Sequence, residues 1–412
     1  MALLTGNAVV GQAGGPTVVI NQSLVGVIEE VQKHGHIEQL LGARHGVRGI
    51  VEGDFIDLKR QPKQMLEVVA NTPASALGST RDKPDKDYCA KIFEIFKKHN
   101  VRYFFYIGGN DSAMAAQIIN SLAQEARYEL RTIHIPKTID NDLLANDHTP
   151  GYGSAARFIA LALMGDNLDN RALPGVKINI LMGRQAGWLT AASVLARQRE
   201  DDGPHLVYIP ERAFDINQFV EDVGAVYDRF GRVLVAVSEG IRDANGEYWA
   251  QKIAQRVEQD SFGHMQLSGT GALADYLAGS VKEGTKGKIK RVRADTYGYL
   301  QRSFPGVVSP VDAWEARLVG QMAVSYSLDC DRDGSVALVR LPGTTYAVGT
   351  ELLPLEAVAP SKPPTTQDLP DTYIGESGNN IRESFLTYAG PLVGPLPRVG
   401  WFEQVSTASR WG

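Results

Sequence analysis

Two carboxylates and a lysine lie close together in the stretch Pro136–Asp142, which reads PKTIDND. Asp140 and Asp142 flank Asn141, and Lys137 precedes Asp140 by three residues. One carboxylate of such a pair can take a proton from a hydroxyl nucleophile while the other orients that nucleophile or a metal ion. The lysine can supply positive charge to phosphoryl oxygens during a transfer reaction. A polar loop capped by aspartate is the alternative, but the spacing favours a site for phosphoryl transfer.

A second polar turn, GGNDS, follows the apolar run Tyr103–Ile107. Asp111 in this turn can bind Mg²⁺ or a water bound to Mg²⁺, because Mg²⁺ prefers oxygen ligands and usually keeps several waters. Asn110 can add a carbonyl oxygen. The alternative is a simple turn in which Asp111 or Ser112 caps the following helix. Taken alone, this motif is more typical of the cap.

The stretch GQAGGPTVVIN (Gly11–Asn21) joins the first predicted strand to the first predicted helix. Its glycines let backbone N–H groups approach an oxyanion, and a helix N-terminus adds positive potential. The stretch matches neither common nucleotide-binding fingerprint. Thr17 is a candidate N-cap. On its own, the stretch is more typical of a plain strand-to-helix turn.

Three further stretches carry side chains that suit a sugar phosphate. MGRQAGW (Met182–Trp188) places Arg184 after a predicted strand, where a guanidinium can bind a phosphate or a sugar hydroxyl. VSEG places Glu239 at another strand end, where its carboxylate can accept hydrogen bonds from sugar hydroxyls. The alternative for Arg184 is a surface arginine, and the alternative for Glu239 is a loop glutamate. For the third stretch, described next, the alternative is a solvated basic face. The third stretch, RVRADTYGYLQR, contains a cluster able to clamp a phosphomonoester: Arg291, Arg293, Tyr297, Tyr299 and Arg302.

Predicted strands and helices alternate along the part of the chain that carries these motifs. Such alternation predicts βαβ units and parallel sheets covered by helices on both faces. In open α/β sheets, ligands bind beyond the carboxyl ends of the strands, where these motifs lie. The predicted strands are Ala8–Val10, Tyr103–Ile107, Thr132–Ile135, Lys177–Met182, His205–Ile209 and Arg232–Val237; the predicted helices are Ile20–Val31, Ala113–Ala123, Ala186–Arg197 and Ile216–Tyr227.

Composition limits the class of protein. The 412 residues suggest two or three domains, and 43% hydrophobic with 22% charged residues is typical of a globular protein in water. The net charge of −5 argues against a nucleic-acid partner or an anionic membrane surface. Two cysteines, Cys89 and Cys330, do not suggest a disulfide framework. With no signal peptide and no apolar stretch of membrane-spanning length, the expected location is the cytoplasm.

The pattern of alternation weakens after Glu247. Residues 248–290 mix helix and loop signals, and past Pro354 the chain becomes rich in proline. This last part is expected to be a tail that lies over the surface or over a neighbouring subunit.

Taken together, the motifs resemble those of the phosphofructokinase family, in the family's order, from about Ala8 to Arg302. PKTIDND and MGRQAGWL are the most specific of them. Residues 248–290 look like an insertion found in the pyrophosphate-dependent branch. They contain GHMQLSG, which could also match the family motif assigned here to GYLQR. We prefer GYLQR because no arginine follows His264 as Arg302 follows Tyr299. The matching stretches are GGPTVVIN, LGSTR (Leu77–Arg81), IGGNDS, PKTIDND, TPGYGSA (Thr149–Ala155), MGRQAGWL, VSEG and GYLQR.

The resemblance implies a role for each matching position. Asp140 matches the general base that deprotonates the sugar 1-hydroxyl, with Thr138 and Asp142 beside it as substrate and metal-site groups. Tyr299 stands where many relatives have histidine. The other matches contact substrates: Gly14 and Arg81 the donor phosphates, Met182, Gly183, Arg184 and Glu239 the sugar, and Arg293, Tyr299 and Arg302 the 6-phosphate.

Two positions bear on the phosphoryl donor. ATP-dependent members of the family typically have glycine where this chain has Asp111 and Lys137. An acidic group at position 111 would occupy the space of a nucleotide α-phosphate and repel it, whereas Lys137 would offset the charge of a small donor. The pair resembles the pyrophosphate-dependent branch. Asn110 stands where the family usually has an aspartate metal ligand, so the metal assignment is divided between Asn110 and Asp111.

The resemblance implies two Rossmann-like three-layer α/β/α domains with the active site in the cleft between them. Residues 1–140, joined again by part of the C-terminal region, are expected to bind pyrophosphate and Mg²⁺. Residues 141–305 are expected to bind fructose 6-phosphate, and 306–412 form a return segment and tail. A homodimer or homotetramer is expected. ATP-dependent phosphofructokinase is the first alternative, and a non-catalytic paralogue that senses sugar phosphate is the second.

Overall fold

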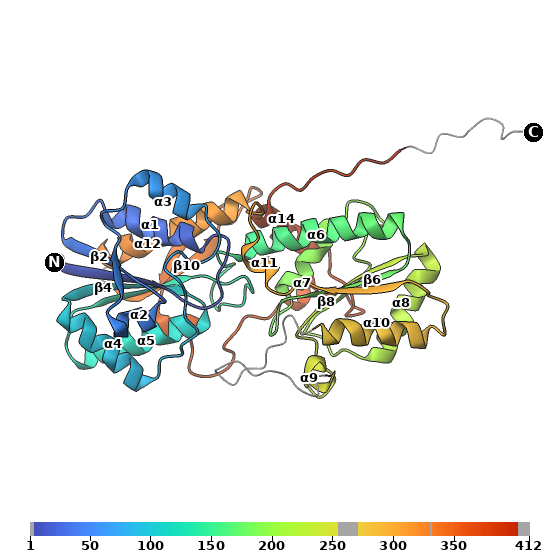
Figure 1. The fold of residues 1–412 in the computed structure, drawn as a ribbon, viewed down its shortest axis with the longest axis horizontal. Coiled ribbons are helices and arrows are strands. Elements are labelled where there is room, and N and C mark those ends of the chain that lie inside the picture. Colours follow the sequence, from blue (N-terminus) through green and yellow to red (C-terminus); the bar gives the residue numbers. More distant parts are fainter. Residues whose placement is uncertain (1–3, 254–270, 330–331, 403–412) are drawn as a thin grey trace, which may run out of the picture.

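The computed structural model describes residues 4–253, 271–329 and 332–402. Two β-sheets, one of seven strands and one of four, lie side by side along the long axis of the molecule (Figure 1). Part of the expected insertion, the GHMQLSG stretch with His264, and Cys330 lie outside the described residues. Cys89 is buried in the larger unit.

The larger sheet is parallel in its centre and antiparallel at both ends, where β10 pairs with β11 and β2 pairs with β3. Strand β4 lies at the centre of the sheet because it has large apolar side chains on both faces. Tyr103 and Phe105 face one side, Phe104 and Tyr106 face the other, and all four are buried. In spatial order its strands are β11 (Val348–Leu353), β10 (Gly334–Arg340), β5 (Arg131–Pro136), β4 (Val101–Gly108), β1 (Gly6–Gln12), β2 (Ile37–Ala43) and β3 (Phe55–Asp57).

Helices cover both faces of this sheet and complete a three-layer unit (Figure 1). One face packs against α1 (Ile20–Val31), α3 (Lys63–Ala70) and α12 (Pro310–Asp329). The other packs against α2 (Val47–Glu52), α4 (Lys86–Lys98) and α5 (Asn110–Glu125).

The smaller sheet is parallel throughout, with β9 (Val292–Thr296) at one edge and β6 (Val176–Leu181), β8 (Val233–Ser238) and β7 (Leu206–Tyr208) following in order. Helices α8 (Ile216–Phe230) and α10 (Ala272–Gly284) cover one face. The other face packs against α6 (Tyr152–Ala172), α7 (Trp188–Ala192), the 3-10 helix η1 (Ser193–Ala196) and α14 (Ser384–Val393). This arrangement and the larger sheet confirm the predicted α/β class. The predicted helix Ala186–Arg197 is split between α7 and η1.

The remaining short elements lie at the connections: α9 (Trp249–Ile253), α11 (Leu300–Ser303), α13 (Leu355–Val358) and the 3-10 helix η2 (Asp371–Tyr373). Helix α12 leads the chain from the smaller sheet back to the larger one, where β10 and β11 add to its edge. The chain then crosses once more to place α14 beside α6 (Figure 1).

The expectation that the chain past Pro354 forms a tail over the surface or over a neighbouring subunit was wrong for α14, which is part of the chain's own core. Phe385, Ala389 and Leu392 of α14 are buried in the same core as α6 and α7. The proline-rich composition obscured a short apolar helix whose partners come from distant parts of the sequence. Within the described ranges, no helix is long and apolar enough to cross a membrane.

Candidate active site

A cavity of about 260 Å³ opens beyond the carboxyl ends of β1, β4 and β5, and residues that precede α7 and end α11 close its other side. It brings together ten of the residues singled out from the sequence: Gly14, Arg81, Asn110, Asp111, Lys137, Thr138, Asp140, Asp142, Arg184 and Arg302. Stretches up to 288 positions apart in the sequence therefore meet at one place, as the strand-end argument predicts.

A second cavity of about 270 Å³ adjoins the first and shares Asn110, Asp111, Asp140, Asp142 and Arg184 with it. Its far wall is formed by Ala359, Pro360, Thr365 and Thr366, in the part of the chain that was expected to form a surface tail. The carboxylates therefore lie between two connected spaces, one lined by the glycine-rich turn and one lined by the C-terminal region.

Lys137 follows β5 directly and is 3% exposed. Its Nζ donates a hydrogen bond of 2.8 Å to the carbonyl oxygen of Gly15. A Cβ atom at Gly14, whose φ is +74°, would lie 3.2 Å from that Nζ, and one at Gly15 would lie 3.1 Å from Cζ of Arg302. The glycine-rich turn thus gives two cations room beside its backbone, which is the arrangement an anion needs.

Burial, followed by repulsion from Arg302, lowers the pKa of Lys137 to about 8, although Asp140 and Asp142 oppose that change. The amine is still mostly protonated at neutral pH. A buried ammonium group that makes one hydrogen bond to a carbonyl oxygen can still donate to the oxygens of a phosphate.

Asp140 and Asp142 form a half-buried pair of carboxylates. Burial raises the pKa of Asp140 even though the charges of Arg302 and Lys137 oppose the rise. Burial, and then repulsion from Asp140, raise the pKa of Asp142. Oδ1 of Asp140 is buried with no hydrogen-bond partner among the described residues. An unsatisfied carboxylate oxygen with a raised pKa, lining a cavity, is suited to accept a proton from a bound hydroxyl group.

The stretch Asn110–Ser112 is not a capping turn. Helix α5 already begins at Asn110, its N-cap is Gly109, and no side chain caps it. The three polar residues therefore form the first turn of the helix, where the positive end of the helix dipole favours anions. The predicted cap at Thr17 is also wrong, because Val19 is the N-cap of α1 and no side chain caps that helix.

The two candidate metal ligands differ in their surroundings. Oδ1 of Asn110 is buried without a hydrogen-bond partner in the described structure, and its Nδ2 donates to Oδ2 of Asp142 at 3.4 Å. The side chain of Asp111 is 60% exposed and forms an ion pair of 3.2 Å with Lys83. The oxygens of Asn110 and Asp142 fit Mg²⁺, which accepts amide and carboxylate ligands and keeps several waters. No cluster of three or more His, Cys, Asp or Glu side chains suited to a metal occurs within residues 4–253, 271–329 and 332–402.

Five predicted residues line neither cavity: Met182, Gly183, Glu239, Arg293 and Tyr299. Met182 and Glu239 are buried, and Gly183 has a φ of +137°. The charge of Glu239 acts on the guanidinium of Arg302, so these two groups are near each other. Arg302 also stacks on the ring of Tyr299, with 4.7 Å between Cζ and the ring centroid. Glu239 and Tyr299 therefore lie behind or beside a group that lines the first cavity.

Arg293 lies apart from the other members of the predicted clamp. It projects from β9, the edge strand of the smaller sheet, and its side chain is exposed. Arg291, from the same stretch, lies 3.7 Å from Asp169 in an ion pair. The basic stretch is thus divided: Arg302 lines the cavity, while Arg291 and Arg293 lie on the surface.

Two features of the site were not predicted from the sequence. Lys83 lines both cavities and holds Asp111 in an ion pair. Its position two residues after Arg81 is a signal that could have been used. Asn141, between the two catalytic-site carboxylates, is bonded to Tyr388 of α14, and no spacing in the sequence indicates that contact.

Residues 7–327 match the family model described as phosphofructokinase. The chain belongs to the phosphofructokinase family. The match includes every stretch that lines the first cavity.

Curated relatives of this family cover nearly the whole chain. A pyrophosphate–fructose 6-phosphate 1-phosphotransferase from Rhodospirillum rubrum is 55% identical over 392 residues, which is 95% of each protein. Another from Halomonas elongata is 36% identical, over 94% of this chain and 91% of the relative. Among solved structures, a pyrophosphate-dependent phosphofructokinase from Marinobacter aquaeolei superimposes with a TM-score of 0.82 at 29% identity, covering 97% of this chain and 94% of the other.

Proposed function

We propose that this phosphofructokinase transfers a phosphoryl group from pyrophosphate to the 1-hydroxyl of fructose 6-phosphate, giving fructose 1,6-bisphosphate and phosphate. The observation that carries the proposal is that Asp111 and Lys137 line the same cavity as Asp140. A nucleotide donor would bring its α-phosphate toward the carboxylate of Asp111, whereas pyrophosphate has no such group to place there.

The acceptor is activated by Asp140. Its carboxylate takes the proton of the sugar 1-hydroxyl as that oxygen forms a bond to phosphorus. The bond between phosphorus and the bridging oxygen of pyrophosphate breaks, and inorganic phosphate leaves with the electron pair. Because both sides of the reaction contain phosphate anhydride or ester compounds of similar energy, the transfer is readily reversible and serves glycolysis or gluconeogenesis.

The donor is held by cations and by backbone. Lys137, with Arg81 and the turn at Gly14, binds the pyrophosphate oxygens and stabilises the charge that develops on them. Asn110 and Asp142 would hold Mg²⁺, with Asp111 and Lys83 at the rim of the site. When bound, Mg²⁺ neutralises charge on the phosphate oxygens. Thr138 lies beside Asp140 and contacts the substrate.

The sugar phosphate is held from the smaller sheet. Arg184 and Arg302 bind it within the first cavity, and Met182, Gly183 and Glu239 support them from behind. Tyr299 and Arg293 complete the clamp on the 6-phosphate. Since Arg293 is exposed on an edge strand, we assign its role to the cavity of a neighbouring copy in a homodimer or homotetramer.

The proposal divides the chain by task. Residues 1–140, joined by β10 and β11 from the C-terminal region, form the donor domain, and 141–305 form the sugar-phosphate domain. The proposed location is the cytoplasm.

Formation of fructose 1,6-bisphosphate in a coupled assay, with pyrophosphate or ATP as the sole donor and Mg²⁺ present, tests the function. We expect turnover with pyrophosphate and at most a trace with ATP. Turnover with ATP alone would overturn the donor assignment. The Asp111→Gly, Lys137→Gly double variant should lose most activity with pyrophosphate and gain activity with ATP.

Purified protein that binds fructose 6-phosphate but shows no turnover with either donor would identify it instead as a non-catalytic sensor. Binding is measured by calorimetry on the same preparation that enters the assay. The outcome of the donor assay and that of the binding experiment are therefore compared directly.

A further inference from the structure

Asn141 has a strained backbone between the two carboxylates of the site. Its φ is +56°, in the left-handed region that residues other than glycine rarely adopt, although asparagine tolerates it better than most. This conformation turns the chain so that Asp140 and Asp142 both line the cavities. A strained residue persists where its surroundings hold it, so the groups around Asn141 determine where the carboxylates lie.

The side chain of Asn141 is held by two hydrogen bonds inside the protein, where it is 1% exposed. Its Oδ1 accepts from the backbone N–H of Thr149 at 3.0 Å, and its Nδ2 donates to the hydroxyl of Tyr388 at 2.8 Å. That hydroxyl donates in turn to the carbonyl oxygen of Asp147 at 2.7 Å. Because an N–H can only donate and a carbonyl can only accept, this arrangement has a single orientation for the amide group.

Tyr388 stays protonated under all ordinary conditions, since burial raises its pKa well above 10. It belongs to α14, so its hydroxyl links the last helix of the chain to the loop that carries Asp140. The ring also packs against Trp188 and lies under the guanidinium of Arg340. A Tyr388→Phe substitution would keep both ring contacts and remove the hydroxyl.

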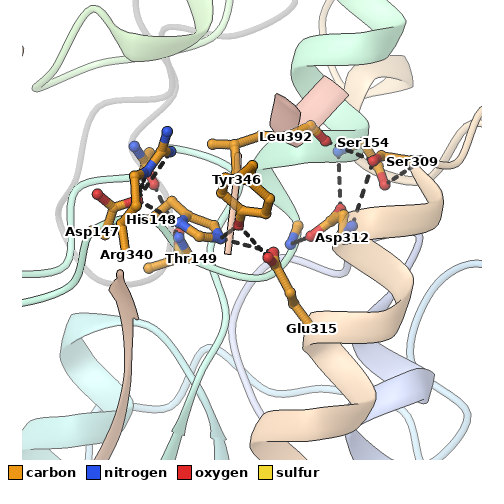
Figure 2. A network of polar contacts seen from close by, with 12 residues as sticks. Asp147, His148, Thr149, Ser154, Ser309, Asp312, Glu315, Arg340, Tyr346 and Leu392 are labelled. Carbon is orange, nitrogen blue, oxygen red and sulfur yellow. Dashed lines mark hydrogen bonds and ion pairs between the residues drawn. The ribbon is translucent and has the colours of Figure 1, made fainter. Parts of the chain in front are cut away.

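The residue whose carbonyl accepts from Tyr388 is held in place through its side chain (Figure 2). Asp147 forms an ion pair with Arg340 of β10 at 3.2 Å and contacts Nδ1 of His148 at 2.7 Å. Nε2 of His148 contacts Glu315 of α12 at 2.7 Å. The segment that receives the tyrosine hydroxyl is therefore anchored to both the larger sheet and α12, and Tyr388 meets a rigid partner.

We propose that Tyr388 is a positioning residue for phosphoryl transfer, acting through Asn141 to hold Asp140 and Asp142 in place. The inference rests on the function proposed above. Small displacements of reacting groups have large effects on rate, because the transfer needs a narrow range of geometries. Loss of the hydroxyl would leave Nδ2 of Asn141 without its partner and allow the loop to shift, without touching either substrate.

The test compares Tyr388→Phe with a matched removal of a hydroxyl elsewhere, Tyr326→Phe. Tyr326 also donates to a carbonyl oxygen, that of Thr350 at 2.7 Å, in a contact between α12 and β11 that lines neither cavity. We expect Tyr388→Phe to lower kcat about 10- to 100-fold, with KM for both substrates within about two-fold of the wild type. Tyr326→Phe should leave kcat unchanged. Thermal unfolding of both variants shows whether they are folded at the assay temperature.

The path through Asn141 is tested by a double-mutant cycle. Asn141→Gly keeps the backbone conformation accessible, because glycine adopts positive φ readily, and removes the amide contacts. We expect Asn141→Gly to lower kcat, and Tyr388→Phe to lower it by less than two-fold more in that background. Multiplicative effects of the two changes would overturn the proposal, as would a Tyr388→Phe enzyme with the kcat of Tyr326→Phe.

Wild-type turnover is measured first with pyrophosphate and with ATP, and the variants are then compared with the donor that the wild type uses. A wild-type enzyme that used ATP would thus contradict the proposed function, and the positioning test would still be carried out with ATP. A rise in KM without a fall in kcat in Tyr388→Phe would contradict a positioning role, because it would mean that substrate binding alone had changed.

Discussion

The two sides of the site differ in how completely one chain builds them. On the side of the larger sheet, Lys137 is buried and Asp140 and Asp142 are half-buried, and the pKa values of all three are shifted by burial and by one another. On the side of the smaller sheet, Arg293 is exposed and Tyr299 is 46% exposed. The first group lines the cavity within the chain, whereas the second presents side chains to solvent.

Sheet position accounts for this difference. Strand β5, which leads into the loop that carries Asp140 and Asp142, has a strand on each side, and helices cover both faces of its sheet. Strand β9, which carries Arg293, is an edge strand with one neighbour. A central strand sends its carboxyl end into a crevice between elements, while an edge strand leaves part of its length open to another chain. The comparison therefore separates residues expected to act within their own chain from residues expected to act across a subunit contact.

The largest effect is expected on the buried side, for Asp140→Asn. The substitution removes the proton acceptor while keeping the shape of the side chain, so kcat should fall about 10²- to 10⁴-fold. KM for fructose 6-phosphate should stay within a few-fold of the wild type. Initial rates in both directions of the reaction give the result. Asp371→Asn, which changes a carboxylate with an 84% exposed side chain, is the matched control and should be silent. An Asp140→Asn enzyme with near-normal kcat would remove the general base from this site.

The next effect distinguishes the two arginines. Arg302→Ala and Arg293→Ala should each raise KM for fructose 6-phosphate about 10- to 100-fold, since each removes a charge-assisted contact to phosphate. Co-refolding either variant with Asp140→Asn chains separates the two sides. The mixture of Arg293→Ala and Asp140→Asn chains should show activity with a low KM. In a hybrid oligomer, Asp140 of an Arg293→Ala chain can share one site with the intact Arg293 of an Asp140→Asn chain.

Arg302→Ala mixed with Asp140→Asn should keep its raised KM, because Arg302 and Asp140 line the cavity of the same chain. If neither mixture, or both mixtures, recovered a low KM for fructose 6-phosphate, the division would be wrong. That division assigns Arg302 to the site of its own chain and Arg293 to the site of a neighbouring chain. The KM measured in each mixture, rather than the total rate, is the decisive quantity.

A smaller effect follows from the pKa of Lys137, which burial lowers to about 8. The amine is charged below that pH and neutral above it, so binding of pyrophosphate should weaken as the pH rises through 8. We expect kcat/KM for pyrophosphate to be about ten-fold lower at pH 9 than at pH 7 from this group. Lys137→Arg keeps the charge and should lose this inflection. A pH profile unchanged by that substitution would assign the titration to another group.

The smallest effect on activity is expected at His148, where a change should instead alter the stability of the fold in a pH-dependent way. Burial opposes a charge on His148, yet hydrogen bonds to Asp147 and Glu315 raise its pKa to about 9. A raised pKa in the folded state stabilises the fold fully below the unfolded value of about 6.5, and the contribution is lost as the pH rises to 9. The loss is on the order of 3 kcal/mol.

Denaturant unfolding of the wild type and of His148→Gln between pH 6 and 9.5 checks this expectation. The difference in stability between the two proteins should shrink as the pH rises. A constant difference would mean that the histidine is neutral in the folded protein, and that it joins the two sides by neutral hydrogen bonds alone.

Much of the fold could be predicted because its signals are local. The apolar run Tyr103–Ile107 lies in β4, and the helical spacing from Ile20 to Val31 corresponds to α1. Polar and glycine-rich stretches after strands predicted a site at one edge of a sheet, and ten of the predicted residues line one cavity. Two local interpretations were wrong for local reasons: Asn110 begins a helix that glycine caps, and Thr17 lies too early to cap α1.

Other parts of the site could not be predicted because they depend on distant contacts. His148 and Glu315 are 167 residues apart in the sequence, and the residues joined by the Tyr388 hydroxyl and the Asp147 carbonyl are 241 apart. No periodicity or spacing relates such positions. The burial of α14, which contradicted the expectation of a surface tail, belongs to the same class.

By itself, the order of residues determined where strands end and which side chains stand at those ends, since both depend on near neighbours in the chain. Folding in three dimensions decided which of those side chains lose water, how their proton affinities shift, and which helix contacts the loop that carries Asp140. Desolvation and electrostatic interaction depend on what surrounds a group in space. For Asp140, Asp142 and Lys137, much of that surrounding comes from residues far away along the chain.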